Sequence, residues 1–162
     1  MRRLRIAPLF VLSLLTISVC NSFGQSTLQH ECAQTAQMDV YSDAHVSEAT
    51  GDLGGFELAL DKPSASPRKA LLFVYEGAAN GDGIPLALTT DGNNVAIKGT
   101  WTEHGTEYPS KKDVVQTHFV KITGTLTPKM FRGTISIEGL EIVNPEHMQL
   151  KRAKQIWICG KH

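Results

Sequence analysis

The sequence has little that would mark an enzyme or a nucleic-acid-binding protein. It lacks the G-x-S-x-G turn of serine hydrolases, the H-E-x-x-H pair of zinc peptidases, an EF-hand loop and a phosphate-binding glycine loop. It also has no surplus of positive charge, because its 16 basic residues equal its 16 acidic ones. Such a chain is a poor counterion for phosphate backbones. We therefore expect no nucleic-acid partner, no cofactor, no metal and no catalytic residue that a motif would identify.

A long apolar segment is also missing, but a short one lies near the start. Arg2, Arg3 and Arg5 precede an uncharged, apolar run over residues 6–19. This run is shorter than the roughly 20 residues that cross a bilayer. A basic head followed by a short apolar segment is typical of a secretory signal peptide. The sequence predicts a signal peptide over residues 1–24 and export to the periplasm or the medium.

Small residues after the apolar run locate the cleavage site. Ser22 and Gly24 occupy the positions that signal peptidase requires, which predicts cleavage before Gln25. Cleavage after Cys20, or a lipoprotein anchored through Cys20, is the alternative. Removal of the leader takes away three arginines, which leaves 13 basic and 16 acidic residues in 138. A chain of that length can form one good core but not two, and we expect no transmembrane segment in it.

Cysteine is scarce, and its placement is informative. Of the three cysteines, Cys20 lies in the leader, while Cys32 and Cys159 lie near the two ends of the mature chain. In an oxidising compartment, an even pair of this kind is expected to form a disulfide. Two free thiols, or a zinc ion held together with His30 and His162, are the alternatives.

Helical periodicity is weak, whereas alternation of apolar and polar residues with a period of two recurs throughout. This pattern is typical of strands that bury one face. It runs through residues 56–60, 84–88, 95–101, 120–126 and 131–137. Residues 70–75 (ALLFVY) are apolar on both faces, so that strand is either central or covered on its outer side. A short apolar run over residues 156–159 would carry Cys159 into the sheet.

Turn residues separate these segments. Residues 91–94 (DGNN), 127–130 (TPKM) and 80–83 (NGDG) predict tight hairpins. Three glycines within residues 51–55 suggest a bulge or a close backbone approach, or, less simply, a site where a ligand nears the backbone. The sequence predicts an all-β fold, a small antiparallel β-barrel of about 7–8 strands, with a β-sandwich as the alternative. Residues 25–44 are predicted to form an N-terminal arm, and residues 45–162 a single domain.

Three short motifs resemble those of small exported bacterial proteins of unknown function. They are GDLGGFE over residues 51–57, a glycine-rich hairpin over residues 124–133, and an LKR…W ending over residues 150–157. Ala153 departs from this pattern, in which glycine follows the basic pair. The resemblance implies a secreted β-barrel, and it implies no activity and no functional residues.

The most polar connection between predicted strands covers residues 102–113 (TEHGTEYPSKKD). Glu103, His104, Glu107 and Tyr108 make it the candidate recognition loop, because long connections in small domains are often functional. The same side chains could instead hold a metal or catalyse a reaction, with His118 near the start of the next strand. A mobile, solvated hairpin tip is the simplest alternative.

Export and the absence of catalytic motifs favour a non-catalytic protein that binds a small ligand or an envelope protein. A hydrolase or metal-dependent enzyme that uses residues 102–113 is the second hypothesis. A structural or assembly subunit of the envelope is the third, with residues 70–75 as an edge that awaits a neighbour.

Overall fold

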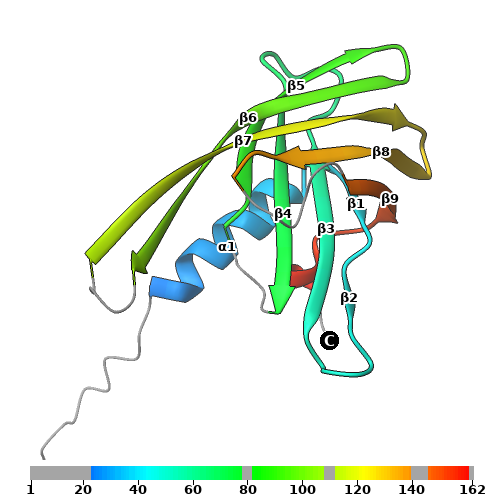
Figure 1. The fold of residues 1–162 in the computed structure, drawn as a ribbon. Coiled ribbons are helices and arrows are strands. Elements are labelled where there is room, and N and C mark those ends of the chain that lie inside the picture. Colours follow the sequence, from blue (N-terminus) through cyan, green and yellow to red (C-terminus); the bar gives the residue numbers. More distant parts are fainter. Residues whose placement is uncertain (1–22, 78–81, 108–111, 140–145, 161–162) are drawn as a thin grey trace, which may run out of the picture.

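The computed structural model describes residues 23–77, 82–107, 112–139 and 146–160, and these residues form a β-barrel (Figure 1). Eight antiparallel strands follow one another around the barrel in the order β1-β9-β8-β7-β6-β5-β4-β3, and pairing of β1 with β3 closes it. Closure leaves no free edge around the barrel, which removes the unpaired backbone groups that recruit other chains. The prediction of a small antiparallel barrel is confirmed.

The described elements have the following bounds. They are α1 (Phe23–Thr35), β1 (Asp39–Ser42), β2 (His45–Val46), β3 (Leu53–Leu60), β4 (Lys69–Gly77), β5 (Ile84–Asp91), β6 (Asn94–Glu107), β7 (Lys112–Leu126), β8 (Met130–Ile137), β9 (Glu146–Ala153) and the 3₁₀ turn η1 (Trp157–Cys159). β2 is the additional strand and pairs only with β3. Within the described residues, no helix has the length and apolarity needed to cross a membrane.

Apolar side chains fill the interior of the barrel. They form one cluster to which every barrel strand contributes, and its largest fully buried members are Tyr41, Phe131, Leu58, Leu60, Leu72, Ile97, Ile122, Ile135, Ile137, Met148 and Leu150. In β5 and in the barrel part of β7, buried and exposed residues alternate, as the period of two predicts. The interior is therefore a packed core.

A second apolar cluster lies outside the barrel wall. Leu71, Phe73 and Tyr75 of β4 pack there with Met38 and Ile156, which precede β1 and η1 respectively. Residues 70–75 are therefore apolar on both faces because one side faces the barrel core and the other is covered. β4 also pairs with both β3 and β5, so it is no edge awaiting a neighbour.

The segment predicted as an N-terminal arm is part of the fold. It contributes α1 and then β1, which pairs with β3 on one side and β9 on the other. The prediction missed β1 because the strand has only four residues, of which two, Val40 and Tyr41, are both apolar and buried. Such a short run has too little periodicity to be read from the sequence.

The C-terminal prediction is also wrong in part. Residues 157–159 form a 3₁₀ turn, and the last strand is β9, which the sequence did not predict. Only Met148 and Leu150 of β9 are buried. Lys151 and Arg152 of the LKR…W ending lie on β9, where Arg152 donates to Asp39 Oδ1 at 2.6 Å.

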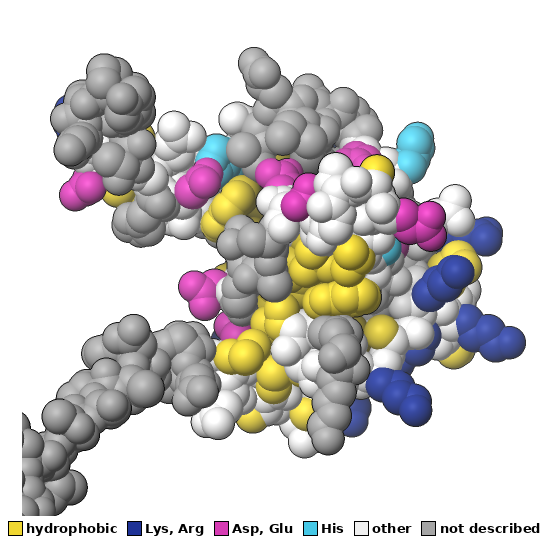
Figure 2. All heavy atoms as spheres, turned by 90° about the horizontal axis from the view of Figure 1, so that it is seen from below, with side chains coloured by type: hydrophobic (Ala, Val, Ile, Leu, Met, Phe, Trp, Pro, Cys, Tyr) yellow, Lys and Arg dark blue, Asp and Glu magenta, His cyan; other side chains and the backbone are white. Residues whose placement is uncertain are grey.

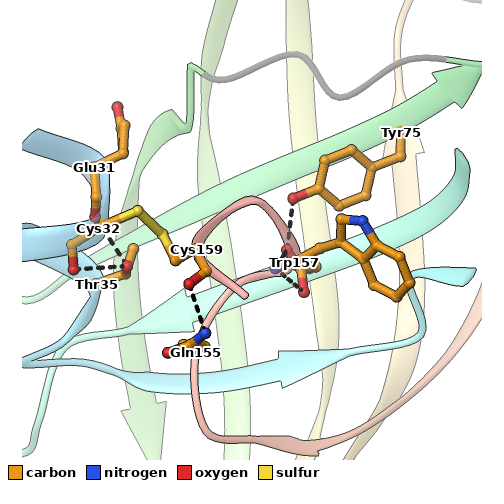
Figure 3. Close-up of a disulfide and its surroundings, with 8 residues drawn as sticks. Glu31, Cys32, Thr35, Tyr75, Gln155, Trp157 and Cys159 are labelled. Carbon is orange, nitrogen blue, oxygen red and sulfur yellow. Dashed lines mark hydrogen bonds between the residues drawn. A yellow bond between two sulfur atoms is a disulfide. The ribbon is translucent and has the colours of Figure 1, made fainter. Parts of the chain in front are cut away.

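The predicted disulfide between Cys32 and Cys159 is confirmed. It joins α1 to η1, and its Cα atoms are 5.7 Å apart across a sequence separation of 127 residues (Figure 3). Both sulfur atoms are used in this bond, so the alternatives of free thiols and of a zinc site built on these cysteines are wrong.

A buried carboxylate holds the C-terminal segment against β3 and β4. Glu57 is 1% exposed. It accepts a hydrogen bond from the Tyr75 hydroxyl at 2.6 Å, and the Trp157 backbone N–H donates to its two carboxylate oxygens at 3.0 and 2.9 Å. Figure 3 shows Tyr75 and Trp157 converging on this point beside the disulfide. The carboxylate thus fixes η1, and with it Cys159, on the outer side of the barrel.

Burial, reinforced by the neighbouring Glu57 carboxylate, raises the pKa of Tyr75 above its ordinary value. The folded state therefore keeps the phenol proton at a pH where the unfolded chain loses it. Stability contributed by this proton is complete below about pH 10, the usual pKa of tyrosine, and falls above it by about 1.4 kcal/mol per pH unit. We expect Tyr75→Phe to remove this fall while costing a constant amount for the lost hydrogen bond.

Urea unfolding of the two proteins at pH 9, 10 and 11 measures the difference. A stability gap between wild type and Tyr75→Phe that stays constant over this range would contradict the prediction. Tyr41→Phe, which removes the hydroxyl of another buried tyrosine, is the control for the loss of a buried hydroxyl group.

Two glycines of the GDLGGFE segment have a structural role. Gly51 and Gly55 have positive φ angles of 77° and 108°. A Cβ at Gly55 would lie 2.8 Å from Asp43 Oδ1, the atom that accepts a hydrogen bond from the Phe56 N–H. The prediction of a close backbone approach is confirmed. At this point β3 stops pairing with β1 and begins to pair with β2.

Candidate recognition site

The longest strands, β6 and β7, continue past the barrel as a two-stranded ribbon. β5 pairs with β6 only up to Lys98, and β8 pairs with β7 only from Val120 onward. Beyond these points β6 and β7 pair with each other as far as Glu107 and Lys112. We call residues 99–107 and 112–119 the ribbon. Figure 1 shows it projecting away from the barrel at the lower left.

The predicted recognition loop is largely strand. Glu103, His104 and Glu107 lie on β6, where they pair with Gln116, Val115 and Lys112 of β7. Tyr108 lies outside the described residues, as do the side chains of His104 and Glu107. The prediction of a connection between strands is wrong for residues 102–107 and 112–113, which are strand, while residues 108–111 lie outside the described residues. The sequence did not reveal these strand residues because this part of the sheet buries little apolar surface. Hydrogen bonds between the backbones of β6 and β7 hold this part of the sheet together, and such pairing produces no alternation of apolar and polar residues in the sequence.

His118 links the root of the ribbon to β8. Its side chain is buried, and its Nδ1–H donates to the Glu138 carbonyl at 3.0 Å. A carbonyl can only accept, so this bond fixes the tautomer and leaves a lone pair on Nε2 when the ring is neutral. Nε2 lies 3.5 Å from Glu103 Oε2, and the ring centroid lies 5.2 Å from that of Trp101. Gly139, at φ 91°, leaves room for the ring.

The structure thus brings together Glu103 and His118, which the sequence placed near each other. The imidazole is enclosed between Trp101 and the β8 end, so its role here is to position the ribbon. Within the described part of the chain, no three His, Cys, Asp or Glu side chains are grouped so that they could hold a metal ion.

Among the described residues, the outward face of the ribbon carries the two most exposed large apolar side chains of the sheet. Val115 and Phe119 are 60% and 59% exposed. Residues opposite each other in an antiparallel pair point to the same face, so Thr100 and Thr102 lie beside Phe119 and Thr117. Sequence reasoning missed Phe119 and Val115, although both alternate with buried or inward residues in the sequence VVQTHFV.

Two surface hollows lie outside the ribbon. One, of about 510 Å³, lies where the end of β5, the start of β6 and the end of β7 meet, and its lining includes Thr89, Asn94 and Thr125. The other, of about 240 Å³, lies at the β2–β3 end of the barrel and includes Asp43 and His45. Burial raises the pKa of the Asp43 carboxyl from its ordinary value, although the Phe56 N–H works in the opposite direction. Both hollows are open to solvent.

This chain matches no protein-family model, no curated protein and no solved structure. The resemblance carried by the short motifs stays a prediction. In the structure, the motif residues Gly55, Glu57 and Trp157 hold the fold together, and function must be inferred from the ribbon and its surroundings.

Proposed function

We propose that the protein is an exported, non-catalytic module that binds another protein through the β6–β7 ribbon. The observation that carries this proposal is the ribbon itself, with Val115 and Phe119 exposed on one face. A two-stranded ribbon is only marginally stable alone in water, and exposed aromatic side chains are the usual anchors of protein interfaces. A chain that maintains both on one projecting element is best explained by a partner that covers it.

The packed interior of the barrel supports a surface function. Leu58, Ile97, Ile122 and Phe131 occupy the space that a cargo molecule would need in a hollow barrel of this size. The rigid barrel instead serves as a support for the ribbon, which His118 anchors at its root.

Export is part of the proposal. The Cys32–Cys159 bond supports it, because disulfides persist in oxidising compartments. The basic and apolar leader supports it as well, and its first 22 residues lie outside the described part of the structure.

Site-specific photo-crosslinking in the producing cell tests the proposal. With a photoreactive residue at Thr117, on the outward face of the ribbon, we expect a discrete covalent adduct with an envelope or secreted protein. The same residue at Lys62, exposed in the β3–β4 connection, is the matched control and should give none. Adding Phe119→Ser should reduce the adduct about tenfold, as loss of an interface anchor does. Equal adducts from both positions, or no effect of Phe119→Ser, would count against the ribbon.

A further inference from the structure

A pair of lysines lies at the root of the ribbon's outward face. Lys98 of β6 and Lys121 of β7 are directly opposite in the register, and both are exposed. Like charges in this arrangement repel and destabilise a sheet. A folded protein retains such a pair at little benefit to its own stability, so the two charges point toward an interaction with something outside the chain.

The neighbours of the two lysines do not compensate them. Across the sheet, Lys98 is flanked by Ala87 of β5, and Lys121 by Ser136 of β8. Glu138, whose backbone N–H donates to the Phe119 carbonyl, is the acidic residue nearest in register. No ion pair joins Glu138 to either lysine among the described residues. The positive charge on this face is therefore available to a partner.

The lysines continue directly into the apolar part of the face. Lys121, Phe119, Thr117 and Val115 follow one another at every second position of β7. Positions two apart on one face of a strand are about 7 Å apart, so this row is about 20 Å long. The row is basic at the barrel end, aromatic next to that and uncharged at Thr117 and Val115, and the following position toward the tip is the exposed Asp113. Its order of charge and apolar surface constitutes a chemical pattern that a partner could match.

We infer that the partner of the ribbon is a protein surface with an apolar recess for Phe119 and carboxylates placed to meet Lys98 and Lys121. This inference rests on the proposed function. An anionic membrane is the less suitable occupant. Each lysine near a lipid surface contributes only about 1 kcal/mol, and stable attachment draws on clusters of four to eight basic residues. A single exposed ring and two lysines on a strip two strands wide fit a shaped recess better than a bilayer.

Selection of peptides from a random phage-displayed library on the purified, oxidised protein tests the inference. We expect the enriched peptides to carry net negative charge together with bulky apolar residues. Binding of a synthesised consensus peptide should fall about tenfold in the Lys98→Glu/Lys121→Glu protein, because charge reversal turns attraction into repulsion. Phe119→Ser should cause a similar loss. The matched charge reversal Lys62→Glu/Lys129→Glu, at exposed lysines off the ribbon, should change binding less than twofold.

The possible outcomes separate this inference from the proposed function. Neutral or basic peptides that depend on Phe119 but not on the lysines would overturn the partner chemistry and leave the ribbon function standing. Peptides whose binding is unchanged by the lysine charge reversal and by Phe119→Ser would overturn both the partner chemistry and the function proposed for the ribbon. Binding only to vesicles of phosphatidylglycerol and phosphatidylethanolamine would replace the acidic protein surface with a membrane. Circular dichroism of each variant confirms that it has folded before its binding is compared.

Discussion

Replacing both Cys32 and Cys159 by serine is expected to lower the free energy of unfolding by about 5 kcal/mol, the loop-closure value for a bond that spans more than a hundred residues. The bond closes a sequence separation of 127 residues. It restricts the unfolded chain far more than a short loop would, since the two ends of the domain are otherwise free to separate. Urea unfolding of the oxidised wild type and the double variant, followed by tryptophan fluorescence, measures the difference.

Within the folded protein, we expect the loss of local stability to be largest in α1. Within the described part of this helix, Thr35 is the fully buried side chain, so α1 places little surface against the barrel. Beyond the disulfide, its contacts are mainly with η1. Hydrogen exchange in the variant should show α1 losing protection before β3 and β4 do. Wild type treated with reductant is the control and should behave like the variant. Equal unfolding midpoints for oxidised and reduced protein would refute the expected stabilisation.

Gly133→Val is the second substitution with a large expected effect. Gly124 and Gly133 are opposite each other on β7 and β8, and the Phe131 ring lies over both. A Cβ at Gly133 would overlap the Thr123 carbonyl oxygen and lie 2.8 Å from Phe131 Cζ. The backbone of two paired strands cannot yield without breaking the sheet, so we expect a loss of about 3 kcal/mol or more.

Gly105→Val is the matched control for this substitution. Gly105 is also a strand glycine, but it lies on the ribbon, where an added Cβ would meet nothing within 4 Å. Because β-branched residues favour strands, Gly105→Val should leave stability unchanged or raise it by up to about 1 kcal/mol. Thermal unfolding of the two variants tests the pair. A similar melting temperature for both would show that the close approach at Gly133 is not the cause.

Much of the barrel could be read from the sequence. The alternation in residues 84–88, 95–101, 120–126 and 131–137 predicted strands that the structure contains, because each buries one face in the barrel core. The DGNN turn was also predictable from the sequence, since Gly92 adopts the positive φ of 56° that such a turn requires. The alternation of apolar and polar residues was sufficient to predict a strand wherever one of its faces is exposed to solvent and the other is buried.

Much less of the candidate site could be predicted from the sequence. The ribbon has no buried face along most of its length, so residues 102–107 looked like a loop although they form a strand. The exposure of Phe119 depends on β8 ending its pairing at the root of the ribbon, and no local pattern reports where a neighbouring strand stops. β1 and β9 were missed for a related reason, because each has only two residues that are both apolar and buried.

The order of polar and apolar residues by itself indicated the strand-rich class and favoured a barrel over a sandwich. The number of cysteines left in the predicted mature chain indicated the pairing of Cys32 with Cys159. Tertiary structure alone decided that Glu57 would receive the Trp157 N–H from 100 residues away, that Arg152 would reach Asp39, and that Lys98 would face Lys121 beside an exposed Phe119. The physical reason is that alternation specifies which face of a strand is buried, whereas strand length and register around a closed barrel specify which exposed side chains come together.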